Sequence, residues 1–436
     1  MTNCGSSFAS FSDLAAHLES LGLFRIRPEL GRLRDVLEKL APISRPKAVL
    51  QVAGTNGKGS TSTFIASLAE AHGLNVGLYT SPHFVSFRER IRFNGVPVSE
   101  EALLEPANKI MAAGGERLTY FEFVTALAAL LFTREAVDIA VMETGLGGTW
   151  DAVTALPVDA VAYTPIGLDH CQILGDTVAA IAKDKAGAMR PHLPVFSAPQ
   201  AEEALHELCR AAEEKHCPVT ISGGHETMPP LVRNGQSALG LAGEHQYANA
   251  GLALAVWRHF AEKHGWNSDE NKETAGLARA FIPGRLQAVP AAPEYGHPAL
   301  LLDGAHNTHG MAALSKSLAQ KGIAPAAVIF SCLEDKIPAE MAAHLRILST
   351  GPVFIPPIGH NPRAMPPEEM AKAVGTGATP VKDMAEALAH AAAHIAAYMP
   401  QETAAHPERH PVLICGSLYM LADFFALRQD CLMPKP

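Results

Sequence analysis

The sequence has little positive charge and no regularly spaced cysteines. Its 35 Lys and Arg residues face 44 Asp and Glu residues, giving a net charge of −9. This acidity argues against a nucleic-acid-binding protein with a broad basic surface, although a local group of backbone N–H groups can still hold a small anion. The seven cysteines are scattered and never spaced C-x-x-C. This pattern argues against a disulfide framework or a zinc site and is typical of a reducing compartment.

Long apolar segments are also missing. No apolar run approaches the roughly 18 residues that a membrane-spanning helix needs. The opening stretch, MTNCGSSFASFSDL, lacks the basic region and apolar core of a secretory signal. We therefore expect a cytoplasmic protein without a membrane partner. Its 436 residues are 48% hydrophobic and 18% charged, which is typical of a globular chain long enough for two domains.

Short apolar runs alternate with helical patterns in the first part of the chain. Helical patterns cover residues 61–72 and 120–133, between apolar runs at 47–53, 137–143 and 158–164. Continuous apolar runs of this length are typical of buried parallel strands. The alternation predicts an α/β fold with a parallel-sheet P-loop domain, and such sheets bind ligands at the carboxyl ends of their strands.

A second, smaller domain is expected after a segment rich in proline and alanine at residues 288–298, which resembles a linker. We predict domains at 1–288 and 289–436, the second of them Rossmann-like. The evidence for it is a predicted helix over 383–396 and renewed apolar runs at 299–305, 326–332, 352–357 and 411–417.

The stretch VLQVAGTNGKGSTSTFIASL, residues 49–68, predicts a strand, a glycine-rich turn and a helix. Gly54, Gly57 and Gly59 allow the backbone to wrap around an anion, Lys58 adds positive charge, and the helix N-terminus favours phosphate. The turn departs from the Walker A pattern, because Val52 stands at the first glycine position and Gly59 directly follows the lysine. A plain strand-to-helix turn would not need three glycines, an asparagine and a lysine together.

Several other residues carry two interpretations. Glu143 ends an apolar strand, so its carboxylate is either a magnesium ligand or a capping or ion-paired group. Arg285 follows IPG and binds either phosphate or an interdomain carboxylate. By composition alone, Lys185 is a solvated helix lysine, His170 is polar surface, and TYFEF (119–123) is apolar enough to be core.

Ordered motifs give a resemblance to a known family. They are GTNGKGS, YTSPHFVSFRERI (79–91), TYFEF, METGLGG (142–148), LDH (168–170), DKAG (184–187), HQYAN (245–249), IPGRLQ (282–287), LDGAHN (302–307) and CGS (415–417). Together they resemble the folylpolyglutamate synthase and dihydrofolate synthase branch of the Mur ligase superfamily. Gly59, interposed after Lys58, resembles this folate branch in particular.

The resemblance implies a set of site residues. One Mg²⁺ would be held by Ser81 and Glu143, and a second by Glu143 and His170 with a carbamylated Lys185. His306 and Ser417 would lie on the glutamate side, and the catalytic set would be Lys58, His170, Lys185 and His306. The substrate would contact Thr119, Tyr120, Phe121, Glu122, Trp150 and Ser417. ATP would contact Gly54, Thr55, Asn56, Gly57, Lys58, Gly59, Ser60, Asn249, Arg285 and Asp303.

The activity implied is ATP-dependent addition of L-glutamate to dihydropteroate, to the γ-carboxylate of folate, or to both, through an acyl phosphate. The expected partners are these small molecules, and the expected assembly is a monomer. Two departures leave the pterin specificity open. The chain has GLGGTWDAVT (145–154) where the family has GLGGRxDATN, and IRPELGRL (26–33) where it has IDLGLERV.

Three other functions stay open. They are a monofunctional folylpolyglutamate synthase, a Mur-type ligase acting on another acid, and a nucleotide-dependent switch without ligase activity. The motifs TNGKGS, TSPH and TYFEF argue against a ligase acting on another acid. A switch would not need DGAHN and CGS in the second domain.

Overall fold

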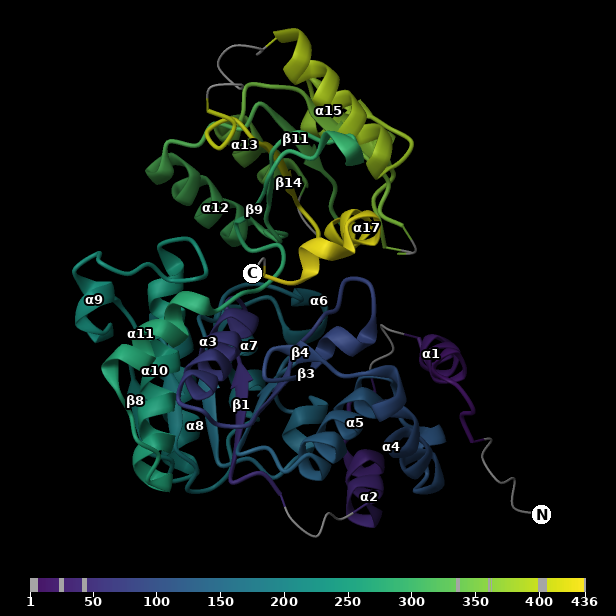
Figure 1. The fold of residues 1–436 in the computed structure, drawn as a ribbon. Coiled ribbons are helices and arrows are strands. Elements are labelled where there is room, and N and C mark those ends of the chain that lie inside the picture. Colours follow the sequence, from purple (N-terminus) through teal and green to yellow (C-terminus); the bar gives the residue numbers. More distant parts are fainter. Residues whose placement is uncertain are drawn as a thin grey trace. The chain divides into compact units, whose positions relative to one another are not determined.

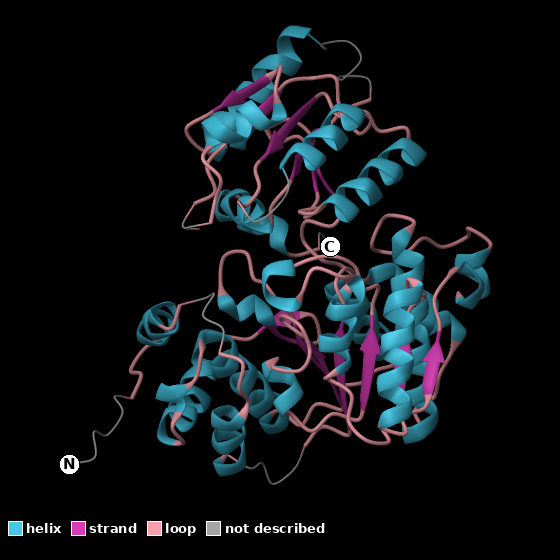
Figure 2. Cartoon of the chain, turned by 180° about the vertical axis from the view of Figure 1, so that it is seen from behind, coloured by secondary structure: helices cyan, strands magenta, loops and turns pink. Residues whose placement is uncertain are grey.

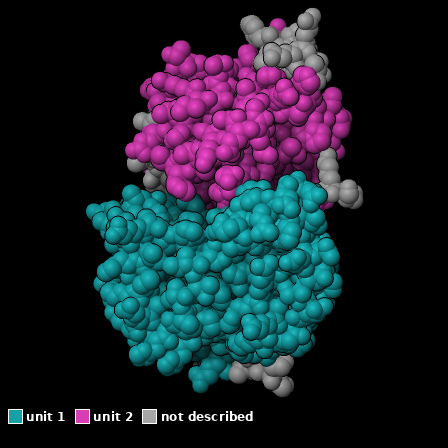
Figure 3. Space-filling model, turned by 90° about the vertical axis from the view of Figure 1, so that its left-hand side faces the viewer, with its two compact units in different colours: residues 1–240, 246–280 teal, residues 241–245, 281–436 magenta. Residues whose placement is uncertain are grey.

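The computed structural model describes residues 7–22, 27–40, 45–334, 338–359, 361, 363–398 and 406–434. The chain forms two compact units, one made of residues 1–240 and 246–280, the other of 241–245 and 281–436 (Figures 1 and 3). Both are α/β structures, as the sequence predicts. Within the described ranges, no helix combines the length and apolarity that crossing a bilayer requires.

The boundary between the units lies near residue 281, earlier than the predicted 288/289, and the short segment 241–245 groups with the second unit. The predicted linker 288–298 is ordered structure. Strand β9 (Gln287–Val289) pairs antiparallel with β10 (Leu300–Leu302), and a 3₁₀ helix, Pro293–Tyr295, lies between them. Proline and alanine therefore mark the turn of a strand pair at this point.

The first unit contains an eight-stranded sheet whose strands lie between helices (Figure 2). Pairing is parallel from β2 through β8 along the sheet, and antiparallel for β2–β3 and β3–β4. In sheet order the strands are β4 (Val96–Pro97), β3 (Ile91–Phe93), β2 (Val76–Tyr79), β5 (Ile139–Glu143), β1 (Ala48–Ala53), β6 (Ala160–Tyr163), β7 (Val195–Ser197) and β8 (Val219–Ile221).

Helices of the first unit bury a large apolar core against this sheet. They are α1 (Phe11–Ser20), α2 (Gly31–Lys39), α3 (Lys58–Ala71), α4 (Glu100–Ala112), α5 (Tyr120–Arg134), α6 (Cys171–Leu174), α7 (Val178–Ala186), α8 (Glu202–Glu214), α9 (Pro230–Arg233), α10 (His245–His264) and α11 (Glu270–Arg279). The predicted helices 61–72 and 120–133 correspond to α3 and α5.

Helix α3 is buried at every position from Ser60 to Ala69. It packs on β1, β2 and β5, and α11 covers its other side. The two helices approach closely at Gly276, where a Cβ atom would lie 2.9 Å from the backbone of Leu68. The Ser67 hydroxyl also donates to the Gly276 carbonyl oxygen at 2.7 Å. Because α3 is enclosed between the sheet and α11, the loop at residues 54–57 that precedes it is held in a fixed position.

Strand register brings four loops to one edge of the first sheet. Val52 of β1 is aligned with Glu143 of β5, and Ala53 is aligned with Tyr163 of β6. Because these strands are parallel, the loops at 54–57, 80–86, 144–151 and 164–170 follow their carboxyl ends together. This edge is where the sequence predicts a ligand.

The second unit contains a six-stranded sheet, parallel except for β9–β10. Its order is β13 (Ala378–Pro380), β12 (Val353–Ile355), β11 (Ala327–Phe330), β14 (Val412–Cys415), β10 and β9. Its helices are α12 (Thr308–Lys321), α13 (Pro338–Leu348), α14 (Pro367–Val374), α15 (Met384–Tyr398) and α17 (Leu418–Leu427). The four predicted strands of this unit and its predicted helix all form.

Candidate active site

The loop between β1 and α3 has the backbone of a phosphate cradle. Gly54 has φ +138° and Gly57, the N-cap of α3, has φ +89°. A Cβ atom at Gly54 would lie 2.0 Å from the Thr164 hydroxyl oxygen, so only glycine fits there. Lys58 donates to the Thr55 carbonyl oxygen at 3.2 Å, which folds its side chain back over the loop.

Helix α10 contributes Asn249 to the same loop. A Cβ atom at Gly57 would lie 2.4 Å from the Asn249 Oδ1 atom, so this amide directly faces the turn. Asn249 is buried and donates to the Gln246 side-chain oxygen at 2.9 Å. The structure thus brings together two predicted ATP contacts that are 192 positions apart in the chain.

The loop after β6 closes the other side of the cradle. The backbone N–H groups of Thr55 and Asn56 donate to the Pro165 carbonyl oxygen, and the Thr55 hydroxyl contacts Gly167. His170 follows in this loop with φ +53°, a strained conformation for a residue with a side chain, and it is exposed. Its backbone N–H donates to Asp169.

Glu143 is buried at the end of β5, with 3% of its surface exposed. Its carboxylate accepts from the Ser81 backbone N–H at 3.0 Å. A Cβ atom at Gly59 would lie 3.6 Å from Glu143 Oε2, so the carboxylate lies beside the start of α3. Ser81, Glu143 and the phosphate loop are therefore neighbours, as the sequence predicts.

Lys185 lies in α7 and is 4% exposed, so the solvated-lysine interpretation is wrong. Burial and the nearby positive charge of Lys58 lower the pKa of Lys185 to about 7. A large fraction of this amine is therefore neutral, and thus nucleophilic, near physiological pH. Gly148 and Gly187 allow the segment after β5 to pack directly on the backbone around Lys185.

The donor set fits a divalent cation only in part. Among the described residues, no three His, Cys, Asp or Glu side chains form a ready metal cluster. Glu143 and Ser81 offer the hard oxygen atoms that Mg²⁺ prefers, while the imidazole of His170 is an unusual ligand for it. The set resembles sites completed by substrate phosphates and water, which need few protein ligands.

The segment TYFEF begins α5, and Thr119 is the N-cap of this helix in a capping box with Glu122. Both carboxylate oxygens of Glu122 contact the guanidinium of Arg32, at 2.8 and 2.9 Å, and both side chains are buried. Arg32 belongs to the divergent segment IRPELGRL, of which Ile26 lies outside the described residues. Glu122 is therefore engaged in joining α2 to α5 and does not offer a free carboxylate to a ligand.

Two aromatic residues of TYFEF differ in their surroundings. The Phe121 ring lies 5.8 Å from the Tyr79 ring and so close to Gly145 that a Cβ atom there would clash with it. Tyr120 is buried against Arg90 and His83. Trp150, in contrast, is 54% exposed. It lies in the loop after β5, which makes it the accessible aromatic surface of this group.

The segment GLGGTWDAVT is organised by its own polar groups. Asp151 accepts from the backbone N–H groups of Gly145, Leu146 and Val153, and burial raises its pKa to about 6. Thr149 stands at the position of the family arginine, and its hydroxyl donates to the Asp184 carbonyl oxygen at 2.8 Å. The replacement thus ties this loop to α7 without adding charge.

Sequence analysis did not single out Arg90 and His83. Arg90 Nε donates to His83 Nδ1 at 2.8 Å, and the guanidinium lies 5.4 Å from the centre of the Tyr120 ring. Burial and Arg90 lower the pKa of His83 to about 3, so the ring is neutral. Both residues lie in the matched motif YTSPHFVSFRERI, but only the β2–β3 pairing brings them beside TYFEF.

In the second unit, Asp303 and Ser417 follow adjacent strands. The Asp303 backbone N–H donates to Ile414, and that of Gly416 donates to Ala305. Burial raises the pKa of Asp303, while Arg285 opposes the shift. Arg285 lies against Gly304, where a Cβ atom would be 2.7 Å from one of its terminal nitrogens.

His306 and Ser417 also have defined roles in their loops. His306 Nδ1 lies 2.7 Å from the Gly304 carbonyl oxygen. Because a carbonyl only accepts, Nδ1 carries the hydrogen of this contact. The buried Ser417 accepts from the Tyr419 backbone N–H at 3.1 Å as the N-cap of α17.

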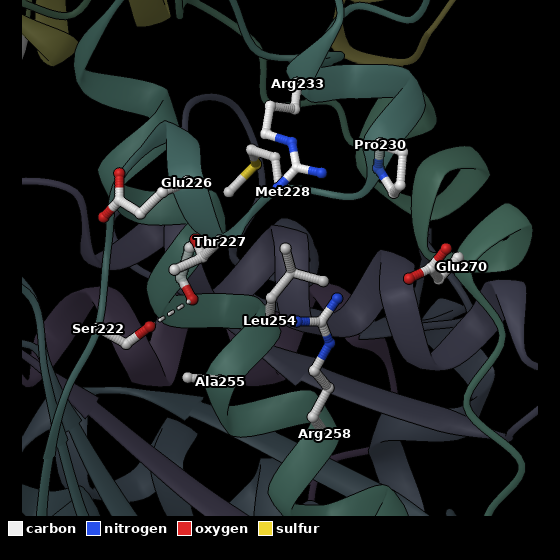
Figure 4. A pocket seen from close by; sticks show the side chains of 11 residues that line it. Ser222, Glu226, Thr227, Met228, Pro230, Arg233, Leu254, Ala255, Arg258 and Glu270 are labelled. Atoms are coloured by element: carbon white, nitrogen blue, oxygen red, sulfur yellow. Dashed lines mark hydrogen bonds between the residues drawn. The ribbon is translucent and has the colours of Figure 1, made fainter.

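A separate cavity of about 330 Å³ lies in the first unit between α9, α10 and α11 (Figure 4). Arg258 lines it but is already paired with Glu273 through two contacts at 2.6 and 2.9 Å. None of the residues that the sequence predicts for the site lines this cavity. We therefore assign the candidate site to the strand edge.

Two family models match the chain. The Mur ligase middle domain matches residues 52–257, and the Mur ligase glutamate ligase domain matches residues 284–417. The chain is 30% identical to the folylpolyglutamate synthase of Lacticaseibacillus casei, over 98% of this chain and 100% of that one. It is 31% identical to the dihydrofolate synthase/folylpolyglutamate synthase of Bacillus subtilis, over 78% of this chain and 84% of that one.

Other relatives are longer. A match to an Arabidopsis thaliana folylpolyglutamate synthase, 39% identical, spans 63% of this chain and 51% of the relative. Among solved structures, E. coli FolC in complex with DHPP and ADP has a TM-score of 0.81 at 27% identity and covers 99% of both chains. The matches in sequence and in fold agree over nearly the whole chain. The chain therefore belongs to the folylpolyglutamate synthase and dihydrofolate synthase family of Mur-type ligases.

Proposed function

We propose that this protein is an ATP-dependent ligase that joins L-glutamate to a pterin-containing carboxylic acid. The acceptor is dihydropteroate, the γ-carboxylate of a reduced folate, or both. One observation carries the proposal: the cradle at residues 54–59 adjoins the buried Glu143 in the first unit, and a full-length match to folate ligases accompanies it. The names of the relatives and the ligands DHPP, ADP and AMPPNP in their structures support the substrate classes.

The phosphate loop would hold the triphosphate. Lys58 and the N-terminus of α3 place positive charge and N–H donors at one point, which suits the β- and γ-phosphates. Asn249 faces Gly57 and would contact the nucleotide from α10. Arg285 and Asp303, which belong to the second unit, are the further ATP contacts that the family resemblance implies. An acceptor carboxylate then attacks the γ-phosphorus, giving an acyl phosphate and ADP.

The amine of glutamate would attack the acyl carbon in the second step. The C–N bond forms, phosphate leaves, and the amine loses a proton. His306 would receive or orient that proton, and its contact with the Gly304 carbonyl oxygen holds the ring in place. Ser417 is the N-cap of α17, also in the second unit. It would orient the glutamate through the backbone at the start of that helix.

Ser81 and Glu143 would hold one Mg²⁺, and Glu143, His170 and a carbamylated Lys185 would hold a second. Bound magnesium would neutralise charge on the phosphates and orient them. A carbamate requires a neutral amine, and the lowered pKa of Lys185 supports this modification. Reaction with CO₂ would convert the buried cation into an anion, which suits a cation-binding position. An AMPPNP and Mn complex of the Yersinia pestis relative supports a divalent-metal requirement.

The substrate side would be formed by Tyr120, Phe121 and Trp150. Exposed Trp150 offers a face for stacking on a pterin or aminobenzoyl ring. Thr119 and Glu122 position this segment by capping α5. We infer cytoplasmic residence and a monomeric state from the same family, without a membrane or nucleic-acid partner.

Product analysis tests the proposal. The purified protein is incubated with ATP, Mg²⁺ and L-glutamate, together with dihydropteroate in one reaction and tetrahydrofolate in another. Mass spectrometry of the products should show one added glutamate, with ADP and phosphate formed in equal amounts. Product from tetrahydrofolate alone would identify a monofunctional enzyme. If ATP is hydrolysed without amide product from either acceptor, a nucleotide-dependent switch is the better description.

A further inference from the structure

Arg90 is a buried cation whose protein contacts are neutral. Only 4% of the residue is exposed, at the junction of the 3₁₀ helix Phe87–Arg90 and β3. Its Nε donates to His83, and its guanidinium lies over the Tyr120 ring. A guanidinium has five N–H donors, so these contacts leave donors available. Burying such a charge without a counter-ion is costly.

The carboxylates of Glu89, Glu122 and Asp151 are engaged elsewhere, and Glu19, whose charge acts on Tyr120, forms no described ion pair with Arg90. Glu89, the adjacent residue, accepts from the backbone N–H groups of Phe84, Val85 and Ser86 at 2.7–2.8 Å. Glu122 pairs with Arg32, and Asp151 accepts three backbone N–H groups. Within the described part of the chain, no Asp or Glu forms an ion pair with Arg90. A ligand can supply the missing negative charge.

The position of Arg90 relates it to the acceptor side of the site. It lies on Tyr120, at the start of the α5 segment that the proposed function assigns to the substrate, and its charge also acts on Tyr79. His83, which orients it, is two residues after Ser81, whose N–H contacts Glu143. A series of contacts therefore links Arg90 directly to Tyr120 and, through His83 and the loop that contains Ser81, to Glu143.

We propose that Arg90 binds the α-carboxylate of the terminal glutamate of a folate acceptor, with His83 as its positioning residue. The inference rests on the proposed function, because it specifies one contact to that substrate. A guanidinium suits a carboxylate that does not react, since tight pairing would make an attacking carboxylate a poorer nucleophile. The reacting γ-carboxylate is instead oriented by the positive charge of Lys58 and the N-terminus of α3 at the phosphate loop.

Amide derivatives of tetrahydrofolate provide the test. Binding of tetrahydrofolate, its α-amide and its γ-amide is measured by titration calorimetry in the presence of ADP and Mg²⁺, with the wild type and Arg90→Gln. Arg90→Gln should weaken tetrahydrofolate and the γ-amide by roughly tenfold to a hundredfold, the range for a lost charge-assisted contact. The α-amide lacks the charged group that Arg90 would bind, so it should bind weakly to the wild type. Arg90→Gln should leave that affinity unchanged.

Arg88→Gln is the matched control. Arg88 lies on the same 3₁₀ helix, but it donates to the Val98 carbonyl oxygen and pairs with Glu100, so its loss should leave all three affinities unchanged. Unchanged ADP affinity will show that the Arg90 variant is folded. If Arg90→Gln does not fold, Arg90→Lys, which keeps the charge but not the fork of donors, replaces it, and a loss of severalfold confined to the same two ligands is expected.

Two results would overturn the assignment. Equal weakening of all three ligands would mean that Arg90 only shapes the aromatic surface, and unchanged binding would mean that it contacts no ligand. In both cases the wild type still binds tetrahydrofolate, so the proposed function stands. If the wild type binds none of the three ligands, the proposed function fails and this assignment fails with it.

Discussion

At the scale of single residues, the site depends on backbone positions that only glycine can occupy. Gly57 combines a positive φ with direct contact to Asn249, whereas Gly73 has a similar φ of +82° and open space around it. Both glycines have a positive φ that side chains rarely allow, but only Gly57 also lacks space for a side chain. Comparing them separates the conformational requirement from the steric one.

Gly57→Ala should abolish measurable ADP binding, because the new methyl group would displace Asn249 and the loop. Gly73→Ala should bind ADP like the wild type and lose about 1–2 kcal/mol of stability from backbone strain alone. Calorimetric titration with ADP and urea denaturation measure the two effects. Wild-type ADP affinity in Gly57→Ala would show that the loop does not hold the nucleotide.

Lys185 gives a pH-dependent prediction. Its pKa is lowered to about 7 in the folded protein and is near its ordinary value of 10.5 in the unfolded chain. Between these values the unfolded chain binds more protons, so the contribution of Lys185 to stability rises with pH. In CO₂-free buffer, the stability difference between wild type and Lys185→Met should therefore rise by up to about 1.4 kcal/mol per pH unit above pH 7.

Bicarbonate provides the companion measurement. Native mass spectrometry at pH 8 should show one added CO₂ in the wild type and none in Lys185→Met, and acid should remove it. A flat stability difference together with an unmodified mass would contradict both the lowered pKa and the carbamate. Lys215, whose amine donates to the Met189 carbonyl oxygen at 2.7 Å, serves as a second lysine for comparison and should stay unmodified.

At the scale of secondary-structure elements, most of the architecture could be predicted from sequence. The apolar runs at 47–53 and 137–143 became β1 and β5 because continuous burial on both faces leaves a clear pattern. The antiparallel strands β3 and β4 were not predicted, since they are only three and two residues long. The contact of Arg90 with Tyr120 depends on that pairing, so the sequence could indicate the motif but not its neighbour.

The proposed roles of Ser81 and Asn249 depended on family resemblance for the same reason, whereas a magnesium role for Glu143 was one of two interpretations of its position after an apolar strand. The strand order β2-β5-β1 decides which loops meet, and no local pattern encodes that order. For Glu122, the sequence shows the residue but not its partner. Its position in an apolar motif was visible in the sequence, but its pairing with Arg32, which lies 90 residues away, was not.

The Arg32–Glu122 pair should dominate the attachment of α2 to α5. Arg32→Ala would leave the buried Glu122 charge without a partner and should cost about 3–5 kcal/mol in urea denaturation. Adding Glu122→Gln should restore part of this loss, because the amide oxygen can still accept from Thr119. Arg45→Ala removes an arginine whose side chain is 44% exposed and should cost at most about 1 kcal/mol. Equal losses of stability in Arg32→Ala and Arg45→Ala would show that burial does not raise the cost of breaking the Arg32–Glu122 pair.

At the scale of the whole molecule, the chain divides into two units, and one short segment within the first part of the chain belongs to the second unit. Residues 241–245 group with the second unit, although the chain on both sides belongs to the first. The predicted nucleotide contacts are distributed in the same way, with Asn249 in the first unit and Asp303 in the second. Ligand effects should therefore be tested on the intact chain.

ADP with Mg²⁺ should stabilise the first unit by mass action. At a free concentration of 100 times Kd, the gain is about 2.7 kcal/mol. In a thermal scan of the full chain, the transition of the unit that contains α3 should move to higher temperature, while Lys58→Ala should unfold at the same temperature with and without the nucleotide. A shift of equal size in Lys58→Ala would place nucleotide binding outside this loop.

The contact between α3 and α11 extends the site beyond the residues that touch a ligand. At Gly276 the obstacle to a larger residue is backbone, which no change of a neighbouring side chain can relieve. A substitution there would displace α3, and with it the loop at its N-terminus. In a genetic screen, such a variant would be classified with the nucleotide-binding mutants, although position 276 lies more than 200 residues further along the chain and contacts no phosphate. The function of this protein therefore depends on Gly276, a residue that a map of ligand contacts would omit.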